Sequence, residues 1–347
     1  MSQRPRIGVI TNPNSRKNRH DPGRFEDMSH VLYGIGVLRR TTDTADIAEV
    51  VREFLDLGLD YWVADGGDGA FHWLTNALVQ VRRERGDVDP MPALMPTNAG
   101  TIDFLGKRAG VIGSSVPLIR ALVRTVRQGR EPEVLTLGSA RFVGQPHTDS
   151  EVKTVFDRIG FAAALAGLSQ RIFDKFYAQD DQGAVGVVRV VVATLLSAAT
   201  QSPLLRRVPF PLEMRHYCDS VFEPMPMDVW VDGQQLPGRT FRDCDVGAID
   251  INLAGIFRFF PSATEPGRLH VQVGDPGPLD VARNLPYMAR GKPLQIPDYF
   301  QGPAMSLRVV AREGRSIDPV IDGELFWGLS EVEVTPGPPI RVIRLKA

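Results

Sequence analysis

The sequence predicts an α/β domain with a parallel sheet, followed by a domain of antiparallel strands. The chain has 347 residues, which is enough for about two domains of ordinary size. In its first third, short apolar runs alternate with longer stretches of helical period, as expected when helices connect parallel strands. Beyond about residue 133, short strands alternate with turns rich in Gly, Pro and Asp, which is typical of an antiparallel sheet.

In the first domain, short apolar runs predict strands at 7–10, 34–38, 61–64 and 93–95. The first ends at the turn signal Asn12–Ser15, and the third leads directly into the glycine-rich segment Gly66–Ala70. Apolar residues at helical spacing predict helices at 46–57, 71–83 and 116–128. Thr42 or Asp43 is a suitable N-cap for the first helix, and Gly129 is a suitable stop for the last.

In the second domain we expect short strands at 133–137, 140–143, 153–156, 227–231, 245–252, 269–273 and 305–311. A mainly helical insertion at 162–205 interrupts them and contains the longest apolar run of the chain. Alternating segments in the tail could close either domain. The expected boundaries are 1–132 for the first domain, 133–315 for the second and 316–347 for the tail.

The composition disfavours several classes of protein. Lys and Arg number 40 against 41 Asp and Glu, and 43% of the residues are hydrophobic, so neither a polyanion-binding nor a disordered chain is indicated. We therefore expect no nucleic acid partner. The 33 glycines and 27 prolines imply many tight turns, which disfavours an all-helical bundle. Cys218 and Cys244 have no His nearby at ligand spacing, so neither a disulfide framework nor a zinc site is indicated.

The apolar runs are too short for targeting or membrane spanning. The run Ile7–Ile10 is shorter than the roughly 7–15 apolar residues of a signal peptide. The stretch Ala184–Thr200 contains Arg189 and falls short of the roughly 20 residues that cross a bilayer. We therefore expect a soluble, cytoplasmic protein.

The sharpest local feature is the segment Gly66-Gly67-Asp68-Gly69-Ala70, between an expected strand and an expected helix. Its three glycines allow the backbone to approach an anion closely, and the helix N-terminus directs N–H groups at that anion. The simpler alternative is a tight turn without a ligand. Asp68 favours a binding site, because a carboxylate in an anion-binding loop is unfavourable unless it meets a cation or a sugar hydroxyl. Mg²⁺ bound with a nucleotide would be such a cation.

This segment resembles the GGDGT motif of the diacylglycerol kinase catalytic-domain family, which includes bacterial lipid kinases and sphingosine kinases and is distantly related to NAD kinases. Other segments resemble family motifs in the same order. Asn12–Ser15 resembles the NPxSG turn, Pro96–Phe104 (PTNAGTIDF) resembles PxGTxNDF, and Asp322-Gly323-Glu324 resembles the C-terminal DGE. Thr42 resembles the threonine that opens the second nucleotide-contacting turn. The resemblance covers nearly the whole chain.

The resemblance implies an N-terminal three-layer α/β domain that binds ATP and a C-terminal β-sandwich that binds the acceptor. It also implies that the terminal segment returns to the first domain and that the active site lies in the cleft between the domains. The implied reaction is transfer of the γ-phosphate of ATP, with Mg²⁺, to a lipid hydroxyl.

The resemblance assigns a role to each candidate residue. Asp322 is the implied general base, with Glu324 as a metal-binding or positioning carboxylate, and Asp68 is the carboxylate linked to Mg²⁺ directly or through water. Asp103 would orient the glycine loop or the metal's waters, or else cap the following helix. The remaining residues would contact the nucleotide, and these are Asn12, Ser15, Thr42, Gly66, Gly67, Gly69, Asn98, Gly100 and Thr101.

Three departures from the family pattern leave alternatives open. Ala70 replaces the threonine of GGDGT, the segment GTID lacks the asparagine of GTxND, and Thr136 stands where many relatives have an aspartate. Asn98 could substitute for the missing asparagine, and its turn also resembles the NAD kinase version. The alternatives are therefore an NAD kinase-like enzyme and a nucleotide-binding regulatory protein with weakened catalysis.

The acceptor is expected to meet residues 162–215. The run Val185–Val192, followed by Ala193–Ala199, is too apolar for an exposed helix, so it is buried in a core or faces an acyl chain. Lys175, Arg206 and Arg207 could rest on anionic headgroups, at roughly 1 kcal/mol each. We therefore expect transient, peripheral membrane contact with a lipid substrate. The oligomeric state, a homodimer included, stays open.

Overall fold

The computed structural model describes residues 6–15, 18–21, 23–147, 155–179, 184–202, 205, 207–253, 257–264 and 266–347. The chain divides into two compact units. Unit 1 comprises Met1–Leu137 and Pro339–Ala347, and unit 2 comprises Gly138–Pro338.

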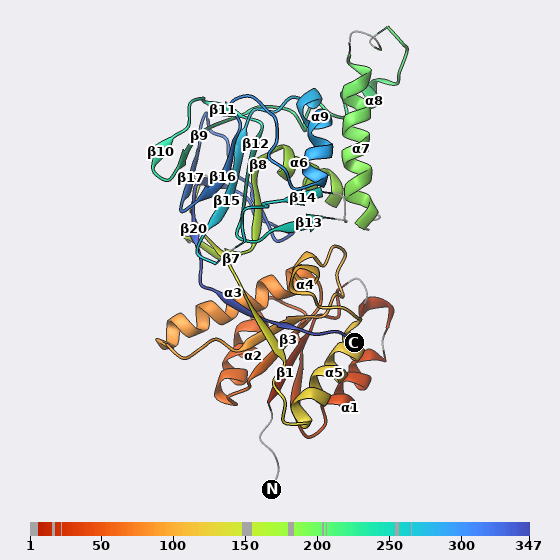
Figure 1. Ribbon diagram of the computed structural model, residues 1–347, viewed down its shortest axis with the longest axis vertical. Coiled ribbons are helices and arrows are strands. Elements are labelled where there is room, and N and C mark those ends of the chain that lie inside the picture. The colour runs from red at the N-terminus through yellow and green to blue at the C-terminus, as the bar shows by residue number, and fades with distance from the viewer. Residues whose placement is uncertain are drawn as a thin grey trace. The chain divides into compact units, whose positions relative to one another are not determined.

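Unit 1 contains a mainly parallel sheet with the strand order β2-β1-β3-β4-β21-β5 (Figure 1). All of its neighbouring strands are parallel except β21 and β5, which are antiparallel. The strands β1 and β3 are fully buried, which explains why they read as unbroken apolar runs. The strand bounds are β1 Ile7–Thr11, β2 Gly36–Arg40, β3 Tyr61–Asp65, β4 Ala93–Pro96, β5 Glu133–Leu137 and β21 Ile340–Arg344.

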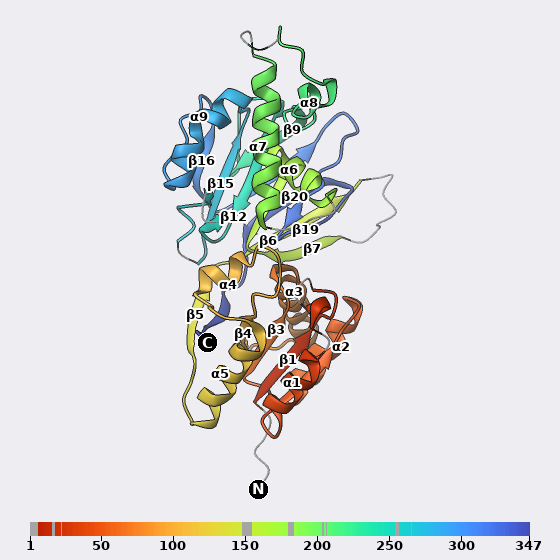
Figure 2. The same ribbon diagram turned by 90° about the vertical axis from the view of Figure 1, so that its right-hand side faces the viewer.

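Helices cover both faces of this sheet, so the predicted three-layer α/β architecture is confirmed (Figures 1 and 2). Helices α2 and α3 pack together on one face, and α1 and α5 pack together on the other. The helix bounds are α1 Arg24–Leu32, α2 Ala45–Asp56, α3 Asp68–Arg85, α4 Phe104–Ala109 and α5 Ser115–Arg127, with a short 3-10 helix at Asn18–His20. Helices α1 and α4 were not predicted, because α1 buries only Arg24, Met28 and Leu32 and α4 is six residues long.

Unit 2 is a sandwich of two antiparallel sheets, with the strand orders β10-β9-β17-β20-β6-β7 and β16-β15-β12-β8-β18-β19. Strand β11 pairs with β9, and β13 pairs with β14 as a separate hairpin. The bounds are β6 Ala140–Pro146, β7 Phe156–Gly160, β8 Ala162–Gly167, β9 Met225–Val231, β10 Gln234–Gln235, β11 Thr240–Phe241, β12 Asp243–Gly247, β13 Ile251–Leu253, β14 Phe257–Phe259, β15 Leu269–Gly274, β16 Phe300–Ala304, β17 Leu307–Ala311, β18 Val320–Ile321, β19 Glu324–Leu325 and β20 Leu329–Pro336.

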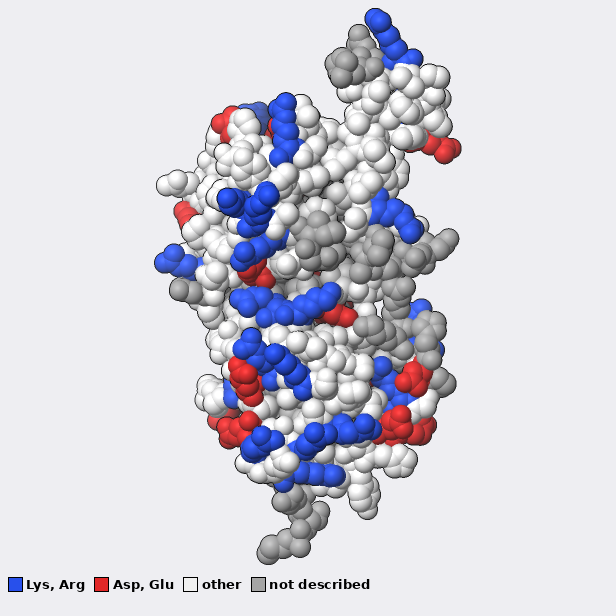
Figure 3. Space-filling model, turned by 45° about the vertical axis from the view of Figure 1, so that its right-hand side comes forward, with Lys and Arg blue, Asp and Glu red and all other residues white. Residues whose placement is uncertain are grey.

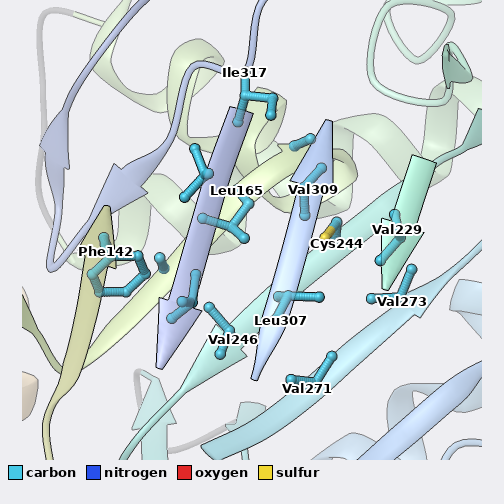
Figure 4. Packing of buried hydrophobic residues seen from close by; sticks show 14 of the residues in the cluster. Phe142, Leu165, Val229, Cys244, Val246, Val271, Val273, Leu307, Val309 and Ile317 are labelled. Atoms are coloured by element: carbon cyan, nitrogen blue, oxygen red, sulfur yellow. The ribbon is translucent and has the colours of Figure 1, made fainter. Parts of the chain in front are cut away.

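One hydrophobic core lies between these two sheets. Phe142 of β6 and Val309 of β17 contribute from one sheet, and Leu165 of β8 and Cys244 of β12 contribute from the other (Figure 4). The predicted antiparallel sandwich is therefore confirmed. Helices α6 (Leu168–Tyr177), α7 (Ala184–Thr200), α8 (Leu212–His216) and α9 (Pro278–Ala289) lie outside the core. None of the helices in the described part of the chain is both long and apolar enough to cross a membrane.

Several segments lie elsewhere than the sequence suggested. The strand 133–137, expected to open the second domain, is β5 and pairs with β21 in the unit 1 sheet. Of the tail, only 339–347 belongs to unit 1, because residues 320–336 supply β18, β19 and β20 to the sandwich.

The helical part of the insertion starts at Leu168 rather than at Ala162. The preceding alanine-rich segment is strand β8, because pairing with β12 and β18 overrides its local helix preference. The expected strand at 153–156 falls partly outside the described residues, and the described strand β7 begins at Phe156.

Candidate functional site

The candidate residues of unit 1 lie on or beside three loops that follow strands β1, β3 and β4, except Thr42, which lies on the loop after β2. Because these strands are parallel neighbours, their loops emerge at the same edge of the sheet. Hydrogen bonds join the loops: Asn12 N donates to Asp65 O (3.2 Å), and Ala99 N donates to Gly66 O (3.0 Å). The three loops therefore form one hydrogen-bonded cluster, which comprises residues 12–15, 66–69 and 96–101.

The glycines of these loops are required by close backbone contact. A Cβ atom on Gly67 would lie 2.5 Å from Gly100 Cα, and a Cβ atom on Gly100 would lie 2.5 Å from Gly67 Cα. On Gly66, a Cβ atom would lie 2.9 Å from Ser15 Oγ. Gly69 is the second residue of α3, whose N-terminus has no side-chain cap. The loops therefore present backbone rather than side chains beside an uncapped helix N-terminus, which suits an anion.

Asp68 uses its carboxylate to hold a second helix terminus. Its Oδ2 accepts a hydrogen bond from Phe104 N (3.1 Å), and its Oδ1 accepts one from Leu105 N (3.0 Å). Both donors lie in the first turn of α4, where a negative charge is favourable. The first turn of α4 thereby stabilises the negative charge of Asp68, a contact that no motif of the sequence indicated.

Asp103 and Asn98 shape the loop after β4. Both have a positive φ, 53° and 54°, and Asp103 Oδ1 accepts a hydrogen bond from Gly100 N (2.8 Å). Asn98 Nδ2 donates to Val111 O (2.9 Å). Asp103 thus holds the residue that contacts Gly67. Thr101 lies in the bend between Gly100 and Asp103 and is half-buried.

A cavity of about 50 Å³ lies beside these loops in unit 1. Two of the expected nucleotide contacts, Asn12 and Thr42, line it, and so does Ala70. Its remaining walls come from strands β1 and β3, helices α2 and α3 and the loop after β2, and are formed by Ile10, Thr41, Asp43, Thr44, Ile47, Ala64, Trp73 and Leu74.

A buried ion pair that the sequence did not reveal holds the three loops in place. Asp65, at the end of β3, is 0% exposed and pairs with Arg24 of α1, which also contacts Ser115 of α5. Thr11 Oγ1 donates to Asp65 Oδ2 (2.7 Å), and Thr97 Oγ1 donates to Asp65 Oδ1 (2.9 Å). The available signal was a carboxylate at the end of a buried strand, just ahead of the glycines.

The candidates of unit 2 lie on a two-residue hairpin turn. Asp322 (φ 52°) and Gly323 (φ 87°) connect β18 to β19, and two positive φ values favour an Asp-Gly pair. Asp322 is 4% exposed, and its Oδ1 accepts hydrogen bonds from Phe161 N (2.8 Å) and Ala162 N (3.0 Å). Glu324 is half-buried at the start of β19.

The same arrangement occurs a second time in unit 2. Asp232 (φ 50°) and Gly233 (φ 77°) connect β9 to β10. Asp232 Oδ1 accepts hydrogen bonds from Met305 N (2.7 Å) and Ser306 N (2.8 Å). The geometry of Asp322 is therefore one that this sandwich also uses at an exposed turn.

Two carboxylates on β12 are also buried, although no motif of the sequence marks them. Asp243 and Asp245 lie on the outer face of β12, where Ser169 Oγ contacts both carboxylates, at 3.3 and 2.6 Å. Tyr299 Oη donates to Asp243 Oδ2 (2.5 Å). Burial raises the pKa of Asp243 to about 6, and burial together with the neighbouring Asp243 raises the pKa of Asp245 well above its usual range.

The mainly parallel sheet with helices on both faces defines unit 1 as an α/β domain, and the candidate loops lie at the carboxyl edge of its sheet. Residues 6–130 match the family model of the diacylglycerol kinase catalytic domain. This part of the chain is therefore similar to the catalytic domain of diacylglycerol kinases. No curated protein matched the sequence.

Solved structures share the fold of both units. A candidate diacylglycerol kinase from Bacillus anthracis str. Sterne superposes with a TM-score of 0.62 at 16% identity, covering 97% of this chain and 96% of its own. A diacylglycerol kinase from the same organism gives a TM-score of 0.58 at 15% identity, with the same coverage. Another candidate diacylglycerol kinase from it gives a TM-score of 0.61 at 16% identity, covering 98% and 97%.

Removing one partner of the Asp65–Arg24 pair should strongly destabilise unit 1. We expect Asp65→Asn to lower the free energy of unfolding by about 3–5 kcal/mol, because Arg24 would remain buried and unpaired. Urea denaturation followed by circular dichroism measures this change. The control is Asp56→Asn, which removes an exposed partner of Arg85 and should cost less than about 1 kcal/mol. Equal effects of the two substitutions would contradict a central role for the buried pair.

The Asp243–Asp245 pair should make unit 2 less stable as the pH rises. Because the folded state raises both pKa values, the stabilising contribution of the pair is fully present below about pH 4 and is lost as the pH rises, for Asp243 through about 6. His270, whose pKa burial lowers to about 4, acts in the opposite direction, so variants are compared at each pH. Asp245→Asn should flatten the pH dependence of the unfolding free energy, whereas the exposed control Asp298→Asn should not. An unchanged slope in Asp245→Asn would refute this assignment.

Proposed function

We propose that the protein is an ATP- and Mg²⁺-dependent lipid kinase that phosphorylates a hydroxyl of a diacylglycerol-like lipid. The proposal is supported by the match of residues 6–130 to the diacylglycerol kinase catalytic domain and, above all, by the backbone contact between Gly67 and Gly100 beside an uncapped helix. With no Cβ atoms at this contact, phosphate oxygens could approach the loops, and the first N–H groups of α3 would donate to them. The adjoining cavity brings together two of the expected nucleotide contacts, Asn12 and Thr42.

Mg²⁺ bound with the nucleotide would neutralise charge on the transferring phosphoryl group. Asp68 and Glu324 are the carboxylates that we propose for it. Since each oxygen of Asp68 already accepts a backbone hydrogen bond, we propose that Asp68 acts through a water molecule. Ser15, Gly66, Gly69 and Thr101 would complete the contacts to phosphate. Asp103 and Asn98 would hold the loop that carries Gly100.

We propose Asp322 as the general base for the lipid hydroxyl. The N–H groups of Phe161 and Ala162 fix one carboxylate oxygen, Oδ1, and so set the direction of the other. That second oxygen, Oδ2, would accept the proton as the hydroxyl oxygen attacks the γ-phosphorus. Tyr177 Oη donates to Gly323 O (2.6 Å) and would steady the turn during this step.

The kinase assignment is tested with γ-labelled ATP, Mg²⁺ and a total lipid extract, with the product identified by mass. Labelled lipid is the expected result. Labelled NADP from NAD would instead favour an NAD kinase-like enzyme, and ATP binding without any product would favour a regulatory protein.

Gly67→Ala should weaken ATP binding by at least about tenfold, because the new Cβ atom would separate the two loops that carry the phosphate donors. Isothermal titration calorimetry measures this affinity. The control is Gly23→Ala, because a Cβ atom there would meet no atom within 4 Å. If Gly67→Ala bound ATP as wild type does, the loops would not be the phosphate site.

Asp322→Asn should lower kcat by about 100-fold or more while ATP binding is retained, because the amide cannot accept the hydroxyl proton. Asp232→Asn is the matched control, since it makes the same change at the same kind of turn in the same unit. A similar loss of activity in both variants would show that the effect comes from the turn and not from a catalytic base.

A further inference from the structure

An arm of unit 2 exposes apolar side chains without a partner among the described residues. The arm consists of α7, α8 and the described residues between them, 201–202, 205 and 207–211. Helix α7 and this arm extend beyond the sandwich of unit 2 in both ribbon views (Figures 1 and 2). Scattered exposed apolar residues are ordinary, whereas a contiguous group marks an interaction surface.

Helix α7 carries apolar side chains on both its faces. Its inner face buries Val187, Val190 and Thr194. Its outer face carries Arg189, Val192, Leu196 and Ala199, which follow the 3–4 residue spacing of one helix face and are all exposed. Val192 is 48% exposed and Leu196 is 53% exposed. The apolar run in the sequence is therefore explained only in part by core packing.

The segment after α7 continues this apolar surface. Leu212 is 73% exposed, and Leu205, Val208 and Met214 are also exposed. The segment is fastened to α7, because Arg215 O accepts hydrogen bonds from Ser197 Oγ (3.0 Å) and Gln201 Nε2 (2.6 Å). The exposed side chains are thus held in place by the fold.

The charge of the arm is positive. Its described charged side chains are Arg189, Arg207 and Arg215 against Glu213, and Arg206 of the sequence lies outside the described residues. Figure 3 shows Lys and Arg at the far end of this projection, above a surface that is mostly neither basic nor acidic. Apolar side chains with basic neighbours fit the headgroup region of an anionic bilayer.

The dimensions favour a helix that lies at the interface rather than one that crosses the membrane. Helix α7 has 17 residues and is therefore about 25 Å long, less than the roughly 30 Å hydrocarbon core. Its inner face is also occupied by packing against α6 and α9. Only the outer face and the α8 segment are therefore available to a bilayer.

We propose that the α7–α8 arm is a membrane-docking element that inserts Val192, Leu196 and Leu212 into the headgroup region of an anionic bilayer. This inference extends the proposed function, since a kinase of membrane lipids must reach the bilayer. It depends on the surface of unit 2 and not on phosphoryl transfer, so it can be tested without ATP.

The test is sedimentation of the purified protein with phosphatidylcholine vesicles, with and without phosphatidylglycerol. Wild type should bind the anionic vesicles more tightly. Leu196→Asp/Leu212→Asp should reduce the partition coefficient by at least about tenfold. The control Val88→Asp/Tyr33→Asp makes the same charge change at exposed positions of unit 1, where Val88 is 95% exposed, and should bind as wild type does. Circular dichroism verifies that every variant is folded.

A second readout reports on the arm directly. In Leu212→Trp, the added tryptophan emission should shift to shorter wavelength when anionic vesicles are present, and in Val88→Trp it should not. The proposal is overturned if the wild-type protein does not bind anionic vesicles. It is also overturned if Leu196→Asp/Leu212→Asp and Val88→Asp/Tyr33→Asp lose vesicle binding equally. It is also overturned if light scattering shows a wild-type dimer that Leu196→Asp/Leu212→Asp dissociates, because the face would then serve a second copy of the chain.

Vesicle binding and kinase activity give separable answers. A protein that docks on anionic vesicles but labels no lipid would support the arm and reject the proposed reaction. A protein that phosphorylates a lipid dispersed in detergent, but does not dock on vesicles, would support the reaction and reject the arm.

Discussion

The ion pair between Asp65 and Arg24 is the interaction on which the organisation of unit 1 depends. The Asp65 carboxylate, at the end of β3, accepts hydrogen bonds from Thr11 at the end of β1 and Thr97 just after β4. It also forms an ion pair with Arg24 of α1. Because both ions are buried, each is costly without the other, and the surrounding loops are held in the arrangement that keeps them together. The glycines follow from this arrangement, since drawing the loops after β3 and β4 together leaves no space for a Cβ atom between Gly67 and Gly100. The buried ion pair thus fixes the loops, and the glycines of these loops present backbone atoms at their surface.

Much of the fold could be predicted from the sequence because its signals are local. Continuous apolar runs marked β1 and β3, helical spacing marked α2, α3 and α5, and the change of period marked the sandwich. The rest depends on contacts that are distant in the chain. Nothing in an alanine-rich hexapeptide indicates that β8 pairs with β12, which lies about 80 residues later. Arg24 reads as an ordinary charged residue until Asp65 and Ser115 are placed around it.

In the candidate site, too, the sequence indicated which residues matter but not what each of them contacts. The motif positions were recognisable, and the loops of unit 1 that carry them do come together. The role of Asp68 was not recognisable, because its partners are backbone N–H groups of a short helix that the sequence did not predict. The two Asp-Gly hairpins make a related point. Asp232 and Asp322 share their backbone conformation and their pattern of hydrogen bonds, so a motif of this kind specifies a turn before it specifies any chemistry.

The place of β21 has a consequence for how the protein is made. This strand sits between β4 and β5 in the sheet of unit 1, yet it follows the whole of unit 2 in the chain. During synthesis, the first 137 residues leave the ribosome with β4 and β5 lacking their common neighbour, and exposed strand edges of this kind invite wrong pairing. The described strands of unit 2 all lie between Gly138 and Pro338, so their pairing does not wait for a strand from outside that range. The sandwich can therefore finish folding first, and the domain that begins the chain is completed only when the strand that follows unit 2 arrives.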